Sequence, residues 1–341
     1  MRAVIVEKPG QFAVVNDKPI PKADENTVVI KVDYTAICGS DRIYWETDLM
    51  LGRSLGHEFA GTIHDPGTSE FHVGQRVAAM ELNPCGKCAA CRSGRSNVCP
   101  SLMDNSPGIS IDGGQAEYVA VRKDMVRAVP EHVSQKLAAI TEPVAVAYHG
   151  VKRAGLKGGE RLLIIGAGPI GIFAAACAKA AGANYVGIVD MNDKRLELAG
   201  SQCFVDQVFD SRSDDYRAQI KKAAPERFTH VLECTGTKGG IQNAMNCIQN
   251  GGRLVTLGIH DDIQEINMLR ILLKEIEIVP SAFFTPEEFT EVLELMESGR
   301  LGLEGCITDV RGFSQVQSSF EEIFRHGNYT QLKILIDPTL P

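Results

Sequence analysis

Four cysteines of this chain lie close together, with the spacing of a metal site. Cys85, Cys88 and Cys91 are each separated by two residues, and Cys99 follows after seven more. Four thiolates in one short segment suit a structural zinc ion that is closed to substrate, with Zn–S bonds of about 2.3 Å. The alternative is four free or disulfide-bonded cysteines in a loop. We expect zinc, and we expect its loss to unfold this lobe locally, because the segment has little apolar content of its own.

A second set of residues is more widely spaced and has the types that hold a catalytic metal. Cys38 and Asp41 come first, Gly56-His57-Glu58 follows, and Glu142 stands later in the chain. A catalytic zinc site has three protein ligands and one position open to water or substrate. By residue chemistry, Cys38 and His57 are ligands, Asp41 orients the imidazole, and either Glu58 or Glu142 is the third ligand. Taken alone, His57 is better explained as a core residue and Cys38 as a buried thiol, so the surrounding pattern has to decide.

A glycine-rich turn lies in the second half of the chain. The apolar run 162–165 is too short for a helix, and Gly166, Gly168 and Gly171 follow it at the start of a long Ala-rich helical segment. This order predicts a strand, a tight turn and a helix, with the helix N-terminus facing a pyrophosphate. Asp190 closes the next strand 19 residues after Gly171. A carboxylate there accepts hydrogen bonds from a ribose diol and repels a 2′-phosphate, so the expected ligand is NAD rather than NADP.

Two kinds of element surround these motifs. From Ala3 to about Val129, short β-rich runs alternate with Gly, Pro and Asn, which predicts a compact barrel-like β domain. A helical pattern first appears near 134–154. Strands and helices then alternate, which predicts a doubly wound parallel sheet of six strands. The expected strands of that sheet are 162–165, 185–190, 205–209, 230–234, 253–257 and 277–279, and the expected helices after the glycine turn are 194–202, 215–224, 240–248 and 268–274.

The tail beyond Ser281 no longer fits this alternation. Its expected elements are helices at 287–298 and 314–325 and a strand at 332–336. We expect the tail to return to the first domain, so that 1–150 and 282–341 form the catalytic domain and 151–281 forms the nucleotide domain. The coenzyme would then lie in a cleft between the two domains.

The composition limits the possible partners and compartments. The 341 residues are 44% hydrophobic and 23% charged, with a formal net charge of −8 and no Lys/Arg cluster. These values argue against nucleic acid or an anionic membrane as a partner. No apolar run approaches the roughly 20 residues that span a bilayer, and the first residues do not resemble a signal peptide, so we expect a cytoplasmic protein. The remaining cysteines are expected to be small buried hydrophobes: Cys177, Cys203, Cys234, Cys247 and Cys306.

In their order along the chain, these motifs resemble the zinc-dependent medium-chain dehydrogenases. The motifs are Cys38-Gly39-Ser40-Asp41, Gly56-His57-Glu58, the four-cysteine lobe, Asp112 to Tyr118, Glu142-Pro143 and Gly166 to Gly171. The similarity covers essentially the whole chain. Within the family it is strongest to the sorbitol and polyol dehydrogenases, on the segment from Cys38 to Trp45 and on Leu232-Glu233-Cys234-Thr235-Gly236.

The resemblance implies a fold, an activity and a set of site residues. The fold is α/β, with a GroES-like β-rich catalytic domain and a Rossmann coenzyme domain. The activity is reversible oxidation of a secondary alcohol with one catalytic zinc, one structural zinc and NAD. In the catalytic domain, Cys38, His57 and Glu58 match the zinc motif, Glu142 reaches the metal directly or through water, Ser40 relays the alcohol proton, Asp41 orients the histidine and Tyr44 lines the substrate pocket. The implied coenzyme-binding residues are Gly166, Gly168, Pro169, Ile170, Gly171, Asp190, Arg195 and Thr235.

The chain also departs from the family pattern. Ile43 replaces a histidine of the outer proton relay, and Ser281-Ala282-Phe283-Phe284 stands where sorbitol dehydrogenases tend to have an arginine, so sorbitol itself is not the expected substrate. Arg42 and Arg53 lie near the zinc motifs. A guanidinium there would suit an anionic substrate, although ordinary solvent-facing arginines explain them better.

Several functions fit these residues. The main expectation is an NAD-dependent zinc dehydrogenase acting on a polyol or sugar-derived alcohol. The alternatives are a sugar-acid, sugar-phosphate or L-threonine 3-dehydrogenase of the same fold, or an NAD-binding regulator without activity. A zinc-free quinone reductase is disfavoured by the four-cysteine lobe. Because family members commonly pair subunits at the edge strand 277–279, we expect a homodimer or homotetramer.

Overall fold

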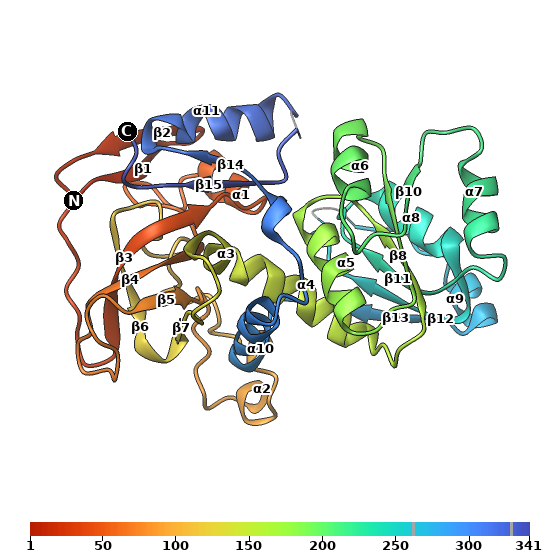
Figure 1. Cartoon of the computed structure of the whole chain (residues 1–341), viewed down its shortest axis with the longest axis horizontal. Helices are drawn as coiled ribbons and strands as arrows, with labels where there is room; N and C mark the ends of the chain where they lie inside the picture. Colours follow the sequence, from red (N-terminus) through yellow and green to blue (C-terminus); the bar gives the residue numbers. More distant parts are fainter. Residues whose placement is uncertain (261–262, 328–329) are drawn as a thin grey trace. The chain divides into compact units, whose positions relative to one another are not determined.

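The protein folds into two compact units, which are described separately. The computed structural model describes residues 1–260, 263–327 and 330–341. The first unit comprises 1–142, 284–299 and 306–341, and the second comprises 143–283 and 300–305. Residues from both ends of the chain therefore build the first unit. Figure 1 shows the course of the chain.

The first unit is built around a seven-stranded sheet, as expected for a β-rich domain. Its strands run in the order β14-β15-β3-β4-β5-β7, and β6 pairs with β3 outside this path. A separate hairpin is formed by β1 and β2. The bounds are β1 Ala3–Lys8, β2 Gln11–Val15, β3 Thr27–Ala36, β4 Glu58–Asp65, β5 Arg76–Ala79, β6 Tyr118–Arg122, β7 Val126–Ala128, β14 Ile307–Arg311 and β15 Lys333–Ile336.

The pair of β3 and β4 forms the centre of this sheet. Val28, Val29 and Ile30 are fully buried on β3, and such β-branched residues favour extended backbone. Gly61 of β4 makes the close approach of the two strands possible, because a Cβ at this position would lie 2.0 Å from the carbonyl oxygen of Lys31. Antiparallel pairing puts Ala36, at the end of β3, opposite Glu58, at the start of β4. Segments that are distant in sequence thus meet at this end of the sheet.

An aromatic cluster joins both ends of the chain. The Trp45 ring lies 5.6 Å from the Phe320 ring and 6.2 Å from the Phe12 ring, measured between centroids. Phe320 belongs to α11, which lies beside the N-terminal hairpin (Figure 1). Arg2 also donates a hydrogen bond to the carbonyl of Leu340. The C-terminal segment is therefore part of the core of the first unit.

The helices of the first unit are mostly short. The bounds are α1 Asp41–Glu46, α2 Ala89–Arg92, α3 Gln135–Ala139, α10 Pro286–Glu297 and α11 Val316–Phe320, with 3-10 segments at Ser96–Val98, Lys123–Met125 and Phe313–Gln315 and a π-helical turn at Glu321–Arg325. A further 3-10 segment, Glu304–Cys306, begins in the second unit and ends in the first. The expectation that no helix precedes 134 was wrong. The helices α1 and α2 have six and four residues, which is too short for a helical period to show in the sequence.

The second unit contains the predicted six-stranded parallel sheet. Its strand order is β10-β9-β8-β11-β12-β13, which is that of a doubly wound fold with the reversal beside β8. The strands are β8 Arg161–Ile165, β9 Tyr185–Asp190, β10 Gln207–Asp210, β11 Phe228–Glu233, β12 Ile248–Thr256 and β13 Glu277–Pro280. The helices are α4 Thr141–Ala154, which begins in the first unit, α5 Pro169–Ala180, α6 Asp193–Gly200, α7 Tyr216–Ala223, α8 Lys238–Cys247 and α9 Met268–Lys274. Among the described residues, none of the helices has the length and apolar character to cross a membrane.

Candidate active site

Three of the predicted metal ligands come together at one end of the central strand pair. The ligand atoms of Cys38, His57 and Glu58 all lie within 4.8 Å of one another. Cys38 follows the last residue of β3, and Glu58 begins β4. The pairing of Ala36 with Glu58 is therefore what brings the two motifs together.

The hydrogen bonds around His57 leave one ring nitrogen available to a metal. Its Nδ1 lies 3.2 Å from Oδ1 of Asp41, and the other oxygen of Asp41 accepts a hydrogen bond from the Cys38 backbone nitrogen at 2.9 Å. A carboxylate on one nitrogen fixes the tautomer that presents the other nitrogen as a ligand. Burial disfavours the charged imidazole, but the charges of Asp41 and Cys38 outweigh it and raise the pKa of His57 well above its usual value. The predicted role of Asp41 agrees with this geometry.

Ser40 lies beside the same ring and thiol. Its hydroxyl donates to Cys38 Sγ at 3.2 Å and lies 3.5 Å from His57 Nε2. Ser40 as a residue is partly exposed. Ile43, which replaces the outer relay histidine of the family pattern, is 46% exposed on α1.

Glu58 forms a buried ion pair that the sequence analysis did not predict. Lys333 Nζ lies 2.7 Å from Oε1 and 2.5 Å from Oε2 of Glu58, and also donates to the Ile37 carbonyl at 3.0 Å. Burial disfavours the ammonium, yet the negative charge of Glu58 raises the pKa of Lys333. The available signal was a lysine in the otherwise apolar strand 332–336, because lysine is almost never buried without a partner.

Two more acids lie close to this cluster. Glu142 is 6% exposed and Glu81 is 1% exposed. Burial is the main cause that raises the pKa of Glu81 to about 7 and the pKa of Glu142 well above its usual value, and the two carboxyl groups share a hydrogen bond. Glu81 was missed by the sequence analysis, although a glutamate in the apolar run 77–82 was a signal of the same kind as Lys333.

The donor set fits a divalent cation. The buried carboxyl groups of Glu58, Glu81 and Glu142 lie near His57 and the Cys38 thiol, and Lys333 is paired with one of them, Glu58. Uncompensated buried charges are costly. Thiolate, imidazole and carboxylate are the ligand types of catalytic zinc sites. The choice between Glu58 and Glu142 as third ligand stays open, because Glu142 is not among the three clustered ligands but is electrostatically coupled to Cys38 and His57.

The four-cysteine lobe has the arrangement of a closed metal site. The Sγ atoms of Cys85, Cys88, Cys91 and Cys99 all lie within 4.8 Å of one another. Backbone N–H groups of Lys87 and Cys88 lower the pKa of the Cys85 thiol to about 6, which favours the thiolate that binds metal. All ten cysteines of the chain are free thiols in the structure. The four residues therefore fit a structural zinc ion.

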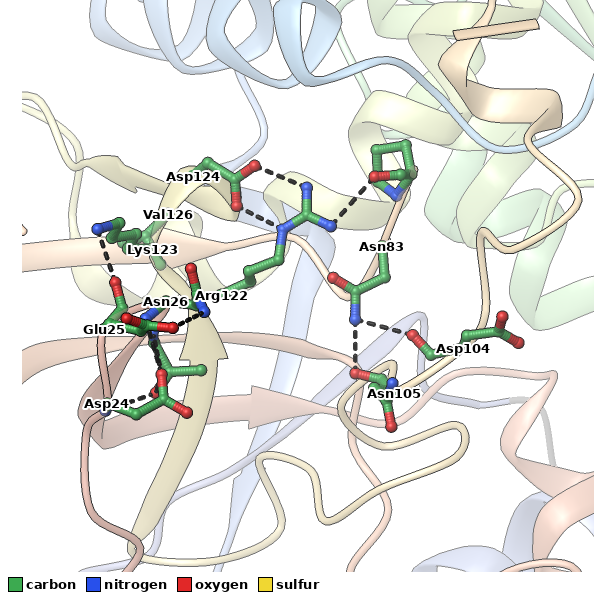
Figure 2. A network of polar contacts seen from close by, with 12 residues as sticks. Asp24, Glu25, Asn26, Asn83, Asp104, Asn105, Arg122, Lys123, Asp124 and Val126 are labelled. Atoms are coloured by element: carbon green, nitrogen blue, oxygen red, sulfur yellow. Dashed lines mark hydrogen bonds and ion pairs between the residues drawn. The ribbon is translucent and has the colours of Figure 1, made fainter. Parts of the chain in front are cut away.

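Hydrogen bonds close the base of this lobe. The Asn83 side chain donates to the carbonyls of Asp104 and Asn105, both at 2.8 Å, and Arg122 donates to the Pro84 carbonyl at 3.1 Å (Figure 2). Arg122 is itself held by Asp124 at 2.5 and 2.6 Å. The segments entering and leaving the lobe are thus joined independently of any metal.

The glycine turn of the second unit has the geometry expected of a dinucleotide site. Gly166 has φ +107°, where a side chain is strained, and a Cβ at Gly171 would lie 1.9 Å from the Gly166 carbonyl. By contrast, a Cβ at Gly168 would meet nothing nearer than 3.8 Å, which leaves room above this position. Pro169 and Ile170 begin the 12-residue helix α5, whose N-terminal N–H groups suit a phosphate. The turn therefore fits the pyrophosphate of NAD.

The other predicted coenzyme residues border the same turn. Asp190 ends β9, and its Oδ2 accepts a hydrogen bond from Ala167 N at 2.7 Å. The guanidinium of Arg195 lies close to Gly168. Thr235 also lies against the turn, because a Cβ added to Gly166 would lie 2.9 Å from the Thr235 methyl group. The sequence analysis named Glu233 only as part of a family motif and gave it no role. It is fully buried, accepts a hydrogen bond from Thr235 N at 2.8 Å and pairs with His260 at 3.1 Å.

Other expectations had mixed outcomes. Tyr44 is half-buried on α1, and burial is the main cause that raises its pKa. Arg42 pairs with Glu46 on the surface at 3.0 Å, and Arg53 donates to the Ser110 carbonyl. Both guanidinium groups are thus held by contacts outside the candidate metal cluster. The expectation of buried cysteines holds for Cys177, Cys247 and Cys306 but was wrong for Cys203, which is exposed, and for Cys234, which is only partly buried.

Comparisons with known proteins agree with this geometry. Residues 24–131 match the alcohol dehydrogenase GroES-like domain, and residues 169–298 match the zinc-binding dehydrogenase domain. The sorbitol dehydrogenase of Bacillus subtilis strain 168 is 31% identical, over 99% of this chain and 97% of the relative. The chain belongs to the zinc-dependent medium-chain dehydrogenases.

Two further relatives of this dehydrogenase widen the comparison. The L-threonine 3-dehydrogenase of Rhizobium johnstonii is 32% identical, over 96% of both chains. A crystal structure of the alcohol dehydrogenase rspB from Escherichia coli CFT073, complexed with NADH, has a TM-score of 0.89 at 26% identity and covers 99% of both chains. The family and its cofactors, zinc and a nicotinamide dinucleotide, are those that the sequence motifs predicted.

Proposed function

We propose that this dehydrogenase reversibly oxidises a secondary alcohol of a polyol or sugar-derived substrate to a ketone, with NAD as the coenzyme. The observation that carries the proposal is the cluster of Cys38, His57 and Glu58, with the Ser40 hydroxyl beside it. A hydroxyl beside the ligands can take up the proton of a bound alcohol, which is a function that a purely structural metal site does not require.

Each residue of the candidate site has a separate role in the proposed reaction. A zinc ion held by Cys38, His57 and either Glu58 or Glu142 would supply a Lewis acid for the alcohol oxygen, and NAD would supply the hydride acceptor. Asp41 keeps the imidazole in the tautomer that leaves Nε2 free. Ser40 receives the proton of the alcohol and passes it directly to solvent, because Ile43 has no group that carries a proton onward. Asp190 favours NAD over NADP at the ribose.

Related substrates remain the main alternatives. A sugar acid, a sugar phosphate and L-threonine would all be oxidised by the same chemistry, and several relatives carry the name L-threonine 3-dehydrogenase. The surface contacts of Arg42 and Arg53 offer no support for an anionic substrate. The intact ligand cluster also argues against a regulator that binds NAD without activity.

The remaining parts of the proposal concern partners and compartment. The partner is a small alcohol rather than nucleic acid or membrane, in line with the net charge of −8. The protein works in the cytoplasm, where ten free thiols stay reduced. It assembles as a homodimer or homotetramer through the sheet edge at β13.

A substrate panel tests the proposed reaction. Zinc-loaded protein is incubated with NAD and with polyols, sugar acids, sugar phosphates or L-threonine, and NADH is read by absorbance. We expect the fastest NADH formation with a polyol or sugar-derived alcohol, and we expect Cys38→Ser and His57→Ala to abolish it while NADH binding persists. Full activity of a zinc-free preparation, or no oxidation of any alcohol in the panel, would refute the proposal.

A further inference from the structure

The strand order of the second unit indicates where each half of a dinucleotide lies. In the parallel sheet, β9 lies on one side of β8, and β11 lies on the other side and is followed by β12. Dinucleotides bind across such a reversal, outside the carboxyl ends of the strands, with one nucleotide on each side. Asp190, the expected partner of the adenosine ribose, ends β9. The nicotinamide half therefore lies over the loops that follow β11 and β12, which are 234–237 and 257–260.

The loop after β11 and the loop after β12 meet at their backbones. Gly236 has φ +65°, and a Cβ at this position would lie 2.1 Å from the Ile259 carbonyl oxygen. A Cβ at Gly258 would lie 2.1 Å from the Gly236 nitrogen. The first of these loops also borders the glycine turn, because Cys234 N donates to the Ile165 carbonyl at 2.9 Å. The arrangement of both loops therefore decides the surface next to the pyrophosphate site.

Glu233, the last residue of β11, is fully buried and connects the two loops. Its carbonyl accepts hydrogen bonds from Leu257 N at 2.8 Å and Gly258 N at 3.0 Å. Its carboxylate accepts from Thr235 N at 2.8 Å, in the first loop, and from His260 Nε2 at 3.1 Å, in the second. Hydrogen bonds to a charged acceptor are stronger than those between neutral groups. The carboxylate of Glu233 thus joins the loops a second time, through side chains.

Other residues of the two loops reach the surface. Thr235 and Thr237 are exposed, and Ile259 is 69% exposed. Two hydroxyls and an apolar side chain are therefore available to the ribose and the ring of a nicotinamide nucleotide. Glu233 is buried and cannot itself contact a coenzyme, so any effect that it has on the coenzyme passes through the loops.

We propose that Glu233 and His260 are a positioning pair, which holds the loops after β11 and β12 in the arrangement that receives the nicotinamide half of NAD. Without the pair, the donors of both loops lose their common acceptor. The adenosine half, at the glycine turn and Asp190, does not depend on the pair. This inference rests on the coenzyme named in the proposed function, but it is independent of which alcohol is oxidised.

The test compares the binding of NADH with the binding of ADP, which has the adenosine and the pyrophosphate but no nicotinamide nucleotide. Both affinities are measured by calorimetry on the full zinc-loaded chain, without alcohol. We expect Glu233→Met and His260→Leu each to weaken NADH binding about 5- to 30-fold and to change ADP binding less than about twofold. Retained ADP binding also shows that a variant is folded.

Two matched controls make the same changes at the opposite edge of the same sheet. His230→Leu lies near the start of β11, where the imidazole contacts Thr229 Oγ1 at 3.0 Å. Glu160→Met lies directly before β8, where the carboxylate accepts from Lys157 N at 2.6 Å. Neither residue is close to the carboxyl ends of the strands. Both control variants should bind NADH and ADP as the wild type does.

A conservative variant separates positioning from general damage. His260→Gln keeps an amide that can donate to Glu233, so it should retain more NADH affinity than His260→Leu. If Glu233→Met does not fold, the comparison of His260→Leu with His260→Gln decides, because His260 is partly exposed.

The outcomes distinguish this inference from the proposed function. Equal weakening of NADH and ADP binding would show that the pair only stabilises the sheet, and unchanged NADH binding in the variants would show that the loops do not need it. Either result would overturn the inference and leave alcohol oxidation in place. A wild type that binds NADH but oxidises no alcohol would instead overturn the proposed function.

Discussion

At the scale of single residues, the site depends on charges that are buried in pairs. The Lys333 and Glu58 side chains are 2% and 0% exposed, and they lie 2.5 Å apart. A buried pair adds little net stability, but removing one partner leaves an uncompensated charge. The C-terminal strand β15 thus supplies the cation that holds Glu58 beside Cys38 and His57.

Replacing Lys333 should therefore destabilise the first unit. We expect Lys333→Met to lower the free energy of unfolding of the zinc-free protein by about 3–5 kcal/mol, and Lys333→Arg to lower it less, because the charge is kept. The measurement is urea unfolding followed by the fluorescence of Trp45, the only tryptophan of the chain, which is fully buried in the first unit. Equal stabilities of Lys333→Met and wild type would show that Glu58 needs no counter-ion.

Asp190 should decide the choice of coenzyme. Its carboxylate ends β9 beside the glycine turn and is bound to the Ala167 nitrogen. We expect Asp190→Ala to lower kcat/KM with NAD by about 10- to 100-fold and to reduce the preference over NADP, since the ribose loses an acceptor and the repulsion of a 2′-phosphate disappears. Asp193→Ala, in the exposed first turn of α6, is the control. An unchanged NAD/NADP ratio in Asp190→Ala would contradict this role.

Site residues could be predicted from the sequence when they stand close together along the chain. Cys38, His57 and Glu58 occur in short motifs that match a known family when they are taken together, and the zinc lobe is contiguous from Cys85 to Cys99. Lys333, Glu81 and Glu233 are single charged residues in apolar runs. Their partners are set by strand pairing between distant segments, and no local spacing reports that pairing.

At the scale of elements, the zinc lobe is the loop 85–99, which has hydrogen bonds at its base and four cysteine thiols in its interior. Asn83 and Arg122 join the two ends of the lobe, while the helix α2 inside it has four residues, none of them buried. Such a short helix has no core and depends on the metal for its order.

Loss of this metal should unfold the lobe alone. We expect Cys91→Ser to raise amide hydrogen exchange across 85–99, while β5 and β6 stay protected because the hydrogen bonds at the base do not involve the thiols. Hydrogen exchange with mass spectrometry measures this effect. The zinc content should also fall by about one ion per chain, because the variant keeps only three of the four thiolate ligands. Exposed Cys203→Ser is the control. Increased exchange throughout the first unit would show that the lobe is a structural centre of that unit.

Some helices and strands were predicted from the sequence, and others were missed. The six parallel strands were expected because buried strands give continuous apolar runs separated by helical segments. The helix α1 was missed because six residues contain less than two turns. The strand β14 was missed as well. All five of its residues are partly exposed, so no clear alternation marks it.

At the scale of the whole molecule, one edge of the second unit has an unusual surface. The strand β13 is the last strand of the parallel sheet, so one side of its backbone pairs with no other strand in the part of the chain that the structure describes. The preceding helix α9 exposes four large apolar side chains, which are Met268, Leu269, Leu272 and Leu273 at 61–73% exposure. Unpaired edges and contiguous apolar patches both favour association.

The proposed dimer should therefore depend on α9. Burying one such leucine contributes about 1.5–3 kcal/mol, so Leu272→Glu combined with Leu273→Glu should shift the protein from dimer or tetramer to monomer at micromolar concentration. Sedimentation velocity measures the mass. Val73→Glu, at 67% exposure in the first unit, is the matched control and should leave the assembly unchanged. The double variant should keep its zinc, because all proposed ligands lie in the first unit. An assembly that survives both changes in α9 would place the contact between subunits elsewhere on the molecule.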